Sequence, residues 1–418
     1  MTNATGSNRR QFLAVAAGAG ALAVTARSYG RVMGANERIR IAQIGCGNRG
    51  FAAHMAGIHK HAEAKNVEIV AVCDVWRPYR ERAVEQVRQW YGRKPFATTK
   101  YEEIMARDDI DAVMIATPDH QHCLHLKAAA LAGKDAYCEK PLSMDLDELK
   151  DTCDAVKRAG IVVQIGTQSR SYPAMLGCRK AYQQGLLGRV SRVEQFRNGS
   201  KPNWYKRLDR LPIKKADVDW AEFLKPRPMR PFSDVLFAGW YGYREFCSGS
   251  IGQFMSHFID LVHFITGATY PSCAVAMGDT FIWKDKYKFD CCDQVETTLI
   301  YPEGFMVHYC TNFGNGYGSR TLMYGTRGIM EFHHRQRASL SGQGASERGK
   351  LGKEQPVEKI ECPDHFLNWL QCLRTRKAPV APIEAGYQHS IACILSDQAR
   401  KTGQRQVYDR EKREIRAG

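Results

Sequence analysis

The chain has no hydrophobic run long enough to cross a membrane and no cysteine pairs spaced for a metal or redox site. A membrane-spanning helix needs about 20 consecutive apolar residues, and the most apolar stretch, residues 12–26, is shorter and mostly Ala, Gly and Val. None of the 14 cysteines forms a C-x-x-C pair, which argues against a zinc ribbon or a thioredoxin-type site. Most cysteines lie inside apolar runs, so we expect buried free thiols. The His, Asp and Glu residues also lack metal-ligand spacing, and we predict no metal and no membrane span in the mature protein.

Signs of nucleic-acid binding are also scarce, although the formal net charge is +16. The Lys and Arg residues are scattered, with no basic block between aromatic residues and no helix-turn-helix or zinc-finger spacing. A scattered excess of positive charge is typical of a solvated surface, and an anionic ligand such as an acidic sugar is the alternative explanation. We therefore expect no nucleic-acid partner.

The N-terminus carries the pattern of an export signal. Arg9 and Arg10 precede the weakly apolar stretch 12–26, which ends in small residues that a signal peptidase could cut. This arrangement is typical of a Tat signal, while a disordered basic arm or a short amphipathic helix is the alternative. We expect a signal peptide and linker over residues 1–34, export by the Tat pathway, and a periplasmic or other extracytoplasmic location.

The next part of the sequence alternates short apolar strands with helices. Continuous apolar strands separated by helices indicate a parallel sheet that is buried on both faces. We therefore predict a doubly wound α/β domain of the Rossmann type over residues 35–166. Its expected strands are 39–44, 67–74, 95–97, 112–116, 135–138 and 161–165, and its expected helices are 78–91, 101–106, 122–132 and 146–159.

Beyond residue 166 the pattern changes to longer strands that alternate polar and apolar residues. Such strands, adjacent in sequence without long helices between them, are typical of an antiparallel sheet. We predict an α+β domain over residues 167–418 with a large, open and mostly antiparallel sheet. Its expected strands are 190–197, 272–283, 294–301, 305–312, 320–324 and 328–332; its expected helices are 254–265 and about 387–402, with a surface loop at 339–352.

A glycine motif directly follows the first predicted strand. Gly45, Gly47 and Gly50 form a G-x-G-x-x-G sequence, in which the first glycine permits a tight turn, the second a close approach to a pyrophosphate and the third close helix packing. The second strand ends at Asp74, whose carboxylate can accept hydrogen bonds from ribose hydroxyls. A negative charge there repels a 2′-phosphate, although Arg77 lies nearby. The pattern therefore predicts dinucleotide binding, with NAD favoured over NADP.

Two further motifs follow later strands of the predicted parallel sheet. Thr117 and Pro118, with His122 shortly after, follow one strand, and Glu139-Lys140-Pro141 follows the next. The carboxyl ends of strands in a doubly wound sheet border its ligand crevice. Lys140 is thus a candidate proton relay or substrate anchor, although a Lys before a Pro is also common in ordinary turns.

Together with the glycines and Asp74, these motifs resemble the Gfo/Idh/MocA oxidoreductases, which are named for glucose–fructose oxidoreductase and inositol dehydrogenase. The resemblance covers nearly the whole mature chain. It implies that Lys140 lies beside the nicotinamide and the reacting hydroxyl. One departure is Asp119, where the family usually has Asn. The cofactor-binding residues that the resemblance and the glycine motif predict are Gly45, Gly47, Asn48, Arg49, Gly50, Asp74, Thr117, Pro118, His122, Glu139 and Lys140.

The family's second signature, D-x-G-x-H-x-x-D, corresponds to residues 253–260. His257 and Asp260 match it, whereas Gln253 replaces the first Asp and Met255 the Gly. A neutral His can accept the proton of a hydroxyl while a hydride leaves its carbon, so His257 is the second catalytic candidate beside Lys140; a structural core histidine is the alternative. By resemblance, the substrate residues are Gln168, Arg170, Gln253 and Asp260.

The resemblance implies an NAD-dependent oxidoreductase that transfers a hydride to or from a secondary hydroxyl of a sugar, sugar derivative or polyol. One alternative keeps NAD bound, oxidises a glycoside transiently, eliminates the aglycone and reduces the product again. Because Gln253 cannot carry charge, a non-catalytic sugar-binding or sensing protein is the other alternative. Family members often pair through the open sheet, so a homo-oligomer is expected. Clustered aromatic residues such as Trp204, Tyr205, Trp240, Tyr241 and Tyr243 could stack on a sugar ring or belong to the core.

Overall fold

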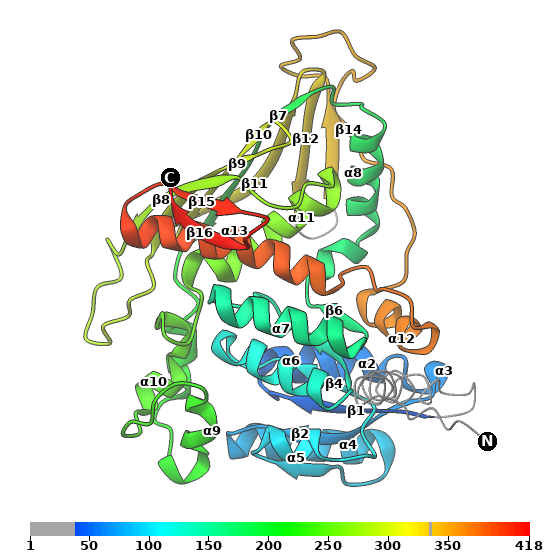
Figure 1. The fold of residues 1–418 in the computed structure, drawn as a ribbon, viewed down its shortest axis with the longest axis vertical. Helices are drawn as coiled ribbons and strands as arrows, with labels where there is room; N and C mark the ends of the chain where they lie inside the picture. The colour runs from blue at the N-terminus through cyan, green and yellow to red at the C-terminus, as the bar shows by residue number, and fades with distance from the viewer. Residues whose placement is uncertain (1–37, 334–336) are drawn as a thin grey trace, which may run out of the picture.

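The computed structural model describes residues 38–333 and 337–418. The predicted Tat signal and linker lie outside the described residues. Two sheets dominate the structure, stacked with helices between them (Figure 1). No helix in the described ranges is both long enough and apolar enough to span a membrane. All 14 cysteines are free thiols, and most of them are buried, as the sequence predicts.

The first sheet is the predicted parallel, doubly wound sheet. Its strand order is β3-β2-β1-β4-β5-β6, and every neighbouring pair is parallel. The order reverses beside β1, so the crevice between β1 and β4 is the expected ligand position. The strands are β1 (Ile39–Ile44), β2 (Val67–Cys73), β3 (Phe96–Thr98), β4 (Ala112–Ile115), β5 (Asp135–Cys138) and β6 (Val163–Ile165).

Helices cover both faces of this sheet. Helices α5, α6 and α7 contribute to one hydrophobic core, whereas η1, α2, α4 and the distant α12 (His365–Thr375) contribute to the other. Helix α12 belongs to the C-terminal part of the sequence, yet its Trp369 and Leu370 pack in the core of the first sheet. The helices in the first part of the chain are η1 (Gly50–Met55), α2 (Ala56–His59), α3 (Ala62–Lys65), α4 (Arg77–Tyr91), α5 (Tyr101–Met105), η2 (Asp119–Gln121), α6 (His122–Leu131) and α7 (Leu146–Ala159).

Within residues 38–333 and 337–418, the second sheet has ten strands in the order β14-β13-β12-β11-β7-β10-β9-β8-β15-β16. Every pair except β7–β10 is antiparallel, which confirms the predicted class. The strands are β7 (Val190–Gly199), β8 (Cys273–Asp279), β9 (Gln294–Tyr301), β10 (Phe305–Asn312), β11 (Asn315–Gly325), β12 (Gly328–His333), β13 (Arg337–Ser341), β14 (Gln355–Pro356), β15 (Gln406–Asp409) and β16 (Glu414–Ala417).

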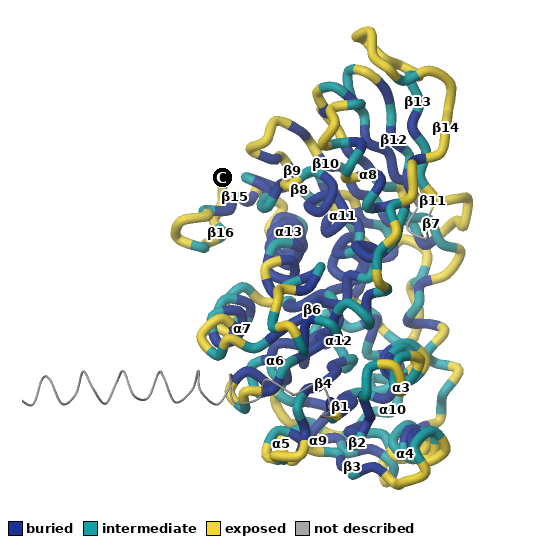
Figure 2. The backbone as a smooth tube through the Cα atoms, turned by 90° about the vertical axis from the view of Figure 1, so that its right-hand side faces the viewer, coloured by how far each residue is buried: buried dark blue, intermediate teal, exposed yellow. Residues whose placement is uncertain are grey.

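The helices of this second part lie mainly between the two sheets, where the buried residues concentrate (Figure 2). The predicted C-terminal helix is present as α13 and begins at Ile383, a turn earlier than expected. Apart from α12, the helices are η3 (Gln168–Ser171), α8 (Pro173–Gln183), η4 (Tyr205–Arg210), η5 (Lys215–Asp217), α9 (Trp220–Leu224), α10 (Asp234–Ala238), η6 (Trp240–Gly242), η7 (Ile251–Met255), α11 (Ser256–Thr266) and α13 (Ile383–Thr402).

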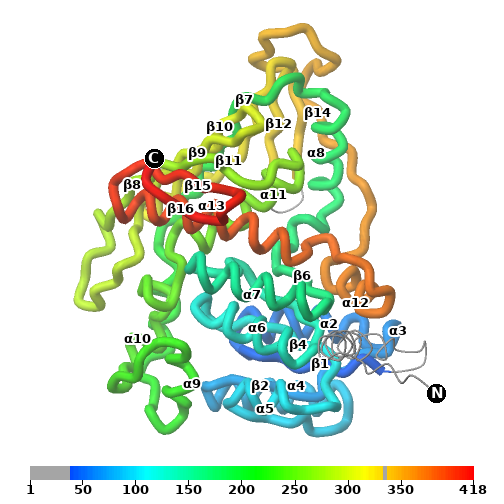
Figure 3. Tube along the Cα trace, in the orientation of Figure 1, coloured from blue at the N-terminus to red at the C-terminus, as the bar shows by residue number. Residues whose placement is uncertain are grey.

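Residues 204–246, which we call the covering segment, leave the second sheet and run down beside the edge of the first (Figure 3). Most of the apolar side chains between residues 208 and 246 form a separate core with Val75 and Trp76, which follow β2. The backbone N–H of Asp219 donates to the carbonyl oxygen of Val75 at 2.9 Å, and Val218 pairs with Trp76 in an isolated bridge. Both main-chain and side-chain contacts therefore fix the segment to the first sheet.

Candidate active site

The glycine turn after β1 has the geometry that its motif predicts. Gly45 has φ +83°, and a Cβ there would lie 2.7 Å from the Ala116 backbone. A Cβ on Gly50 would lie 1.9 Å from the Gly45 carbonyl oxygen, so the helix packs closely under the turn. A Cβ on Gly47 would meet only the Tyr79 ring, at 3.4 Å. The turn is thus open on the side where a pyrophosphate would approach, and this backbone fits a dinucleotide.

Asp74 lies at the end of β2 and is almost fully buried. Its carboxylate accepts the backbone N–H of Cys46 at 2.6 Å and of Trp76 at 2.8 Å. Burial raises the pKa of Asp74 to about 6, although these hydrogen bonds lower it. Arg77, the residue that could favour NADP, forms an ion pair with Asp217 of the covering segment. Each carboxylate oxygen has a second lone pair, so Asp74 can still accept ribose hydroxyls.

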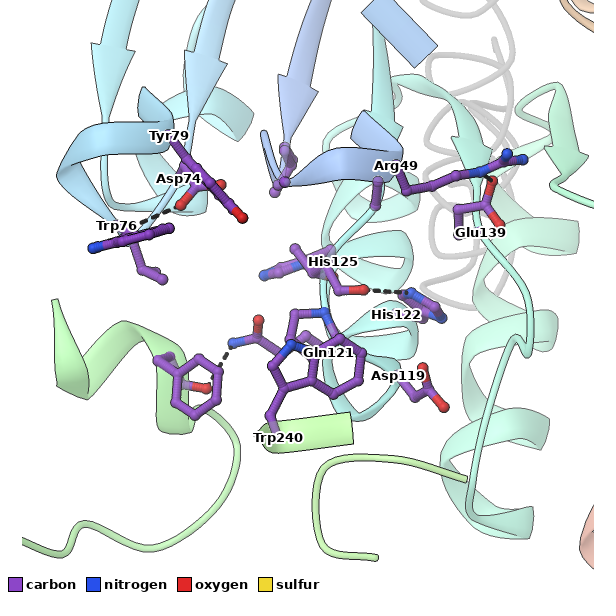
Figure 4. Close-up of a pocket in the computed structure, with 18 of the residues that line it drawn as sticks. Arg49, Asp74, Trp76, Tyr79, Asp119, Gln121, His122, His125, Glu139 and Trp240 are labelled. Atoms are coloured by element: carbon purple, nitrogen blue, oxygen red, sulfur yellow. Dashed lines mark hydrogen bonds and ion pairs between the residues drawn. The ribbon is translucent and has the colours of Figure 1, made fainter. Parts of the chain in front are cut away.

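A cavity of about 340 Å³ lies between the first sheet, the covering segment and η7–α11 (Figure 4). This volume is in the range of small-molecule sites. The cavity brings together most of the predicted site residues, while Gly50 lies beneath the turn and Gln168, Arg170 and Asp260 do not line it. The predicted residues that line the cavity are Gly45, Gly47, Asn48, Arg49, Asp74, Thr117, Pro118, His122, Glu139, Lys140, Gln253 and His257.

Glu139 anchors the E-K-P loop at one end of this cavity. Its carboxylate accepts hydrogen bonds from Arg49 Nε at 2.6 Å and Gln168 Nε2 at 3.1 Å, and it lies 3.0 Å from His54 Nε2. Burial alone would raise the pKa of Glu139, but Arg49 and His54 hold it well below its usual range. Glu139 is therefore a charged anchor, and it explains why Gln168 faces the loop rather than the cavity.

Lys140 extends from the same loop to the opposite wall of the cavity. Its Nζ donates to the main-chain carbonyl oxygen of Gln253 at 2.8 Å and lies 3.4 Å from the side-chain oxygen of the same residue. Burial lowers the pKa of Lys140, while Glu139 and Asp119 oppose that effect. A lysine with a lowered pKa that lines a cavity can exchange a proton with a bound hydroxyl.

His257 lines the same cavity from α11. Burial lowers its pKa well below 6.5, and the nearby Lys140 lowers it further. The imidazole is therefore neutral at neutral pH and can accept a hydrogen bond or a proton. Within the described residues we find no hydrogen-bond partner for the ring, so both ring nitrogens are available to a ligand.

His122 and Thr117 connect the two loops that follow β4 and β5. The ring nitrogens of His122 lie 2.7 Å from the carbonyl oxygen of Pro141 and 2.9 Å from that of Thr117. The Thr117 hydroxyl lies 3.3 Å from Nδ1 of His125. His122 is buried and both of its nitrogens contact carbonyl oxygens of the protein, so it holds the two loops together where they border the cavity.

The predicted substrate residues Arg170 and Asp260 form a buried ion pair with each other. Arg170 Nε and Nη2 donate to the Asp260 carboxylate at 2.8–3.0 Å, and only 1% of the Asp260 side chain is exposed. Arg170 also donates to the Val380 carbonyl oxygen at 3.3 Å. The pair thus links η3, α11 and the chain before α13, and a direct contact with substrate stays a prediction.

Several cavity residues were not predicted from the sequence. Trp76 and Tyr79 lie toward the Asp74 end (Figure 4), Gln121 also lines the cavity, and Arg207 and Arg210 enter from the covering segment. Their neighbours in sequence carry no motif, so only the covering segment's position brings these two arginines to the cavity. Of the clustered aromatic residues, Trp240 and Tyr241 line the cavity, whereas the core encloses Trp204, which is only 1% exposed.

The comparisons with known proteins agree with this geometry. A family model described as "Oxidoreductase family, NAD-binding Rossmann fold" matches residues 39–167. The "GFO/IDH/MocA C-terminal domain" model matches residues 220–331, so the two models together match more than half of the chain. The chain belongs to the Gfo/Idh/MocA oxidoreductase family. The Rossmann domain of this Gfo/Idh/MocA protein is accordingly an NAD-binding domain.

Several curated relatives of this Gfo/Idh/MocA protein are 31–33% identical to it over the matched region. Glycosyl hydrolase family 109 protein 2 of Shewanella sp. (strain ANA-3) is 31% identical over 37% of this chain and 38% of its own length. Levoglucosan dehydrogenase of Pseudarthrobacter phenanthrenivorans is 31% identical over 41% of this chain and 37% of its own length. The matched region thus spans well under half the length of these relatives.

Solved structures of similar fold cover most of the chain. Aldose-aldose oxidoreductase from Caulobacter crescentus, complexed with glycerol, has a TM-score of 0.68 and 19% identity over 88% of this chain and 99% of its own. Levoglucosan dehydrogenase in complex with NADH has a TM-score of 0.66 and 18% identity over 88% and 98%. At these identities the likeness concerns the fold.

Proposed function

We propose that this protein transfers a hydride between NAD and a secondary hydroxyl of a sugar, sugar derivative or polyol. The observation that carries the proposal is a cavity in which Lys140 and His257 lie together with the glycine turn and Asp74. NAD, when bound, supplies the nicotinamide carbon that takes up or releases the hydride. The glycine turn would hold the pyrophosphate and Asp74 the ribose hydroxyls. Because Asp74 is anionic and Arg77 is paired with Asp217, we propose NAD over NADP.

Lys140 and His257 would manage the proton of the reacting hydroxyl. The alcohol must lose its O–H proton as its carbon loses a hydride, and a group within hydrogen-bond reach must take that proton. Burial lowers the pKa of Lys140 and that of His257, which eases deprotonation of the lysine and leaves the imidazole in its neutral, proton-accepting form. Trp240 and Tyr241 line the same cavity and would contact the apolar face of a sugar ring.

The second candidate function is redox-neutral cleavage of a glycoside, in which one NAD molecule stays bound and is regenerated in each turnover. Two observations favour it. The covering segment is hydrogen-bonded to the first sheet and supplies part of the cavity wall, which would slow cofactor exchange. Relatives with about 30% identity are also named as glycosyl hydrolase family 109 proteins.

One experiment separates these functions. The protein is purified from the cytoplasm, denatured, and the released nucleotide identified and quantified by mass spectrometry. Stoichiometric NAD(H), with cleavage of aryl glycosides in the absence of added NAD, would support the glycoside-cleaving function. If the protein releases no nucleotide but binds added NAD and reduces it with a sugar as the hydride donor, the dehydrogenase function is supported. Lys140→Ala should abolish turnover in both cases while NAD still binds; unchanged turnover would refute the assignment of Lys140.

Export and self-association are separate proposals. We propose export by the Tat pathway to the periplasm, on the basis of Arg9 and Arg10; replacing both with Lys should retain the protein in the cytoplasm. We also propose a homo-oligomer that pairs through the open face of the second sheet, because exposed apolar side chains lie on one face of its strands. Light scattering in solution, with charged substitutions on this face, tests the proposal. These side chains are Phe196, Val275, Met277, Ile300 and Met306.

A further inference from the structure

A buried carboxylate, Asp119, lines the same cavity as the catalytic candidate Lys140 and raises its pKa. Asp119 is only 3% exposed. Its Oδ2 accepts hydrogen bonds from the backbone N–H of Ser248 at 2.9 Å and from the Ser248 hydroxyl at 2.6 Å. Its Oδ1 accepts a hydrogen bond from Nε2 of Gln253. Both carboxylate oxygens are therefore bound by donors that come from the C-terminal part of the chain.

This contact determines which way the Gln253 amide points. A carboxylate only accepts hydrogen bonds, so the amide nitrogen of Gln253 must face Asp119 and the amide oxygen must face the other side. There the oxygen accepts the Tyr241 hydroxyl at 2.6 Å and lies 3.4 Å from Lys140 Nζ, which also donates to the Gln253 carbonyl oxygen at 2.8 Å. The geometry thus forms a chain from Asp119 through Gln253 to Lys140.

We propose that Asp119 and Gln253 act as one unit, in which the Asp119 carboxylate orients the Gln253 amide and thereby positions Lys140 and Tyr241. Asp119 is then a positioning residue that supplies the negative charge of this wall, and Gln253 transmits its effect. The structural part of this inference is independent of the proposed function, while its consequence for turnover rests on it.

Residues 119 and 253 are also positions where the chain departs from the motifs that it resembles. The motifs have Asn and Asp at these positions, whereas this chain has Asp119 and Gln253. The hydrogen bond between the two side chains joins the two departures in this structure. One carboxylate here meets one amide, whereas changing Asp119 alone to Asn would place two amides against each other, and changing Gln253 alone to Glu would place two carboxylates against each other.

The isosteric variants Asp119→Asn and Gln253→Glu test this unit. In Asp119→Asn, the Asn oxygen stays with Ser248 and its amide nitrogen faces Gln253, whose amide must then flip. Lys140 and Tyr241 would lose the amide oxygen, and Lys140 would lose a nearby negative charge. In Gln253→Glu two carboxylates would face each other, and the folded protein should become less stable as the pH rises and both ionise. The double variant should restore one amide opposite one carboxylate.

The measurement is the rate at which acetic anhydride labels Lys140 in the cofactor-free protein, followed by mass spectrometry of the peptide across a pH series. The charged groups around Lys140 are Glu139, Asp119, Arg49 and Arg197, with His257 close by. Only neutral amines react, so Asp119→Asn should raise the labelling rate at neutral pH by about tenfold. The double variant should return it to the wild-type rate or below. The control is Asp111→Asn, which alters a carboxylate that is hydrogen-bonded to Arg40, and it should leave the labelling rate of Lys140 unchanged.

The inference is overturned if Lys140 is labelled at the wild-type rate in Asp119→Asn, or if it is labelled as fast in the double variant as in Asp119→Asn. Should Asp119→Asn alone not fold, the double variant decides: a folded double variant with wild-type labelling supports the unit, and an unfolded one refutes it. The labelling needs neither substrate nor NAD. Its outcome is therefore distinguishable from a failure of the proposed function, which would appear as absent turnover with normal labelling in the wild type.

Discussion

Arg170 and Asp260 form a buried ion pair, and variants of the pair can show whether these residues stabilise the fold or contact the substrate. Three N–H···O contacts of 2.8–3.0 Å join the two side chains. Burial raises the pKa of Asp260 even though Arg170 lowers it, so the attraction does not fully offset the desolvation of the carboxylate. The pair is thus sensitive to loss of one partner, because the remaining charge would be buried without a counter-charge.

Asp260→Asn keeps the shape of the side chain and removes its charge. Breaking a buried pair in this way typically costs 3–5 kcal/mol; because Asn can still accept one hydrogen bond from Arg170, we expect a loss of about 3 kcal/mol in the free energy of unfolding. Replacing both residues with apolar ones, as in Arg170→Met/Asp260→Leu, should cost less than the single change, because no charge then stays buried.

Urea denaturation followed by tryptophan fluorescence measures these losses, with the NAD dissociation constant as a check that the site remains folded. The matched control is Asp109→Asn, which breaks the half-exposed pair with Arg107 and should change stability by less than about 1 kcal/mol. If Asp260→Asn unfolds at the wild-type urea concentration and instead raises KM for the sugar, Asp260 contacts substrate and the reasoning from the buried pair is refuted.

Three other predictions concern the cofactor half of the site. Because burial raises the pKa of Asp74 to about 6, the carboxylate becomes protonated below that pH, and the affinity for NAD measured by calorimetry should fall from pH 7 to pH 5. In Asp74→Asn this pH dependence should be absent; a persistent one would assign it to another group. Gly50→Ala should prevent stable folding, because its Cβ would lie 1.9 Å from the Gly45 carbonyl oxygen. Gly47→Ala should fold with wild-type thermal stability but bind NAD at least tenfold more weakly, since its Cβ would occupy the open side of the turn; normal binding by Gly47→Ala would place the pyrophosphate elsewhere.

Much of the fold followed from local patterns. The strands of the first sheet are apolar and buried on both faces, so their runs are visible in the sequence, and β5 and α7 begin and end where predicted. Strands β9 and β10 also match, because one face of the second sheet is exposed and its residues alternate. Helices α8, α9, α10 and α12 and the strands β13 to β16 were missed. The surface loop predicted over residues 339–352 was wrong at its start, because β13 extends to Ser341 and pairs there with β12.

The sequence by itself determined the glycine turn, Asp74 and the E-K-P loop, because each motif is contiguous and follows directly from a strand whose carboxyl end borders the crevice. Only the tertiary structure decided which distant groups meet there. Asp119 contacts Gln253, Arg170 is paired with Asp260, and the covering segment supplies part of the cavity wall. These contacts join residues far apart in the chain. A buried carboxylate has lost its water and needs a hydrogen-bond donor from the protein, and the packing determines which donor lies beside it. A sequence pattern records the type of each side chain, whereas its partner depends on how the two sheets and the covering segment pack together.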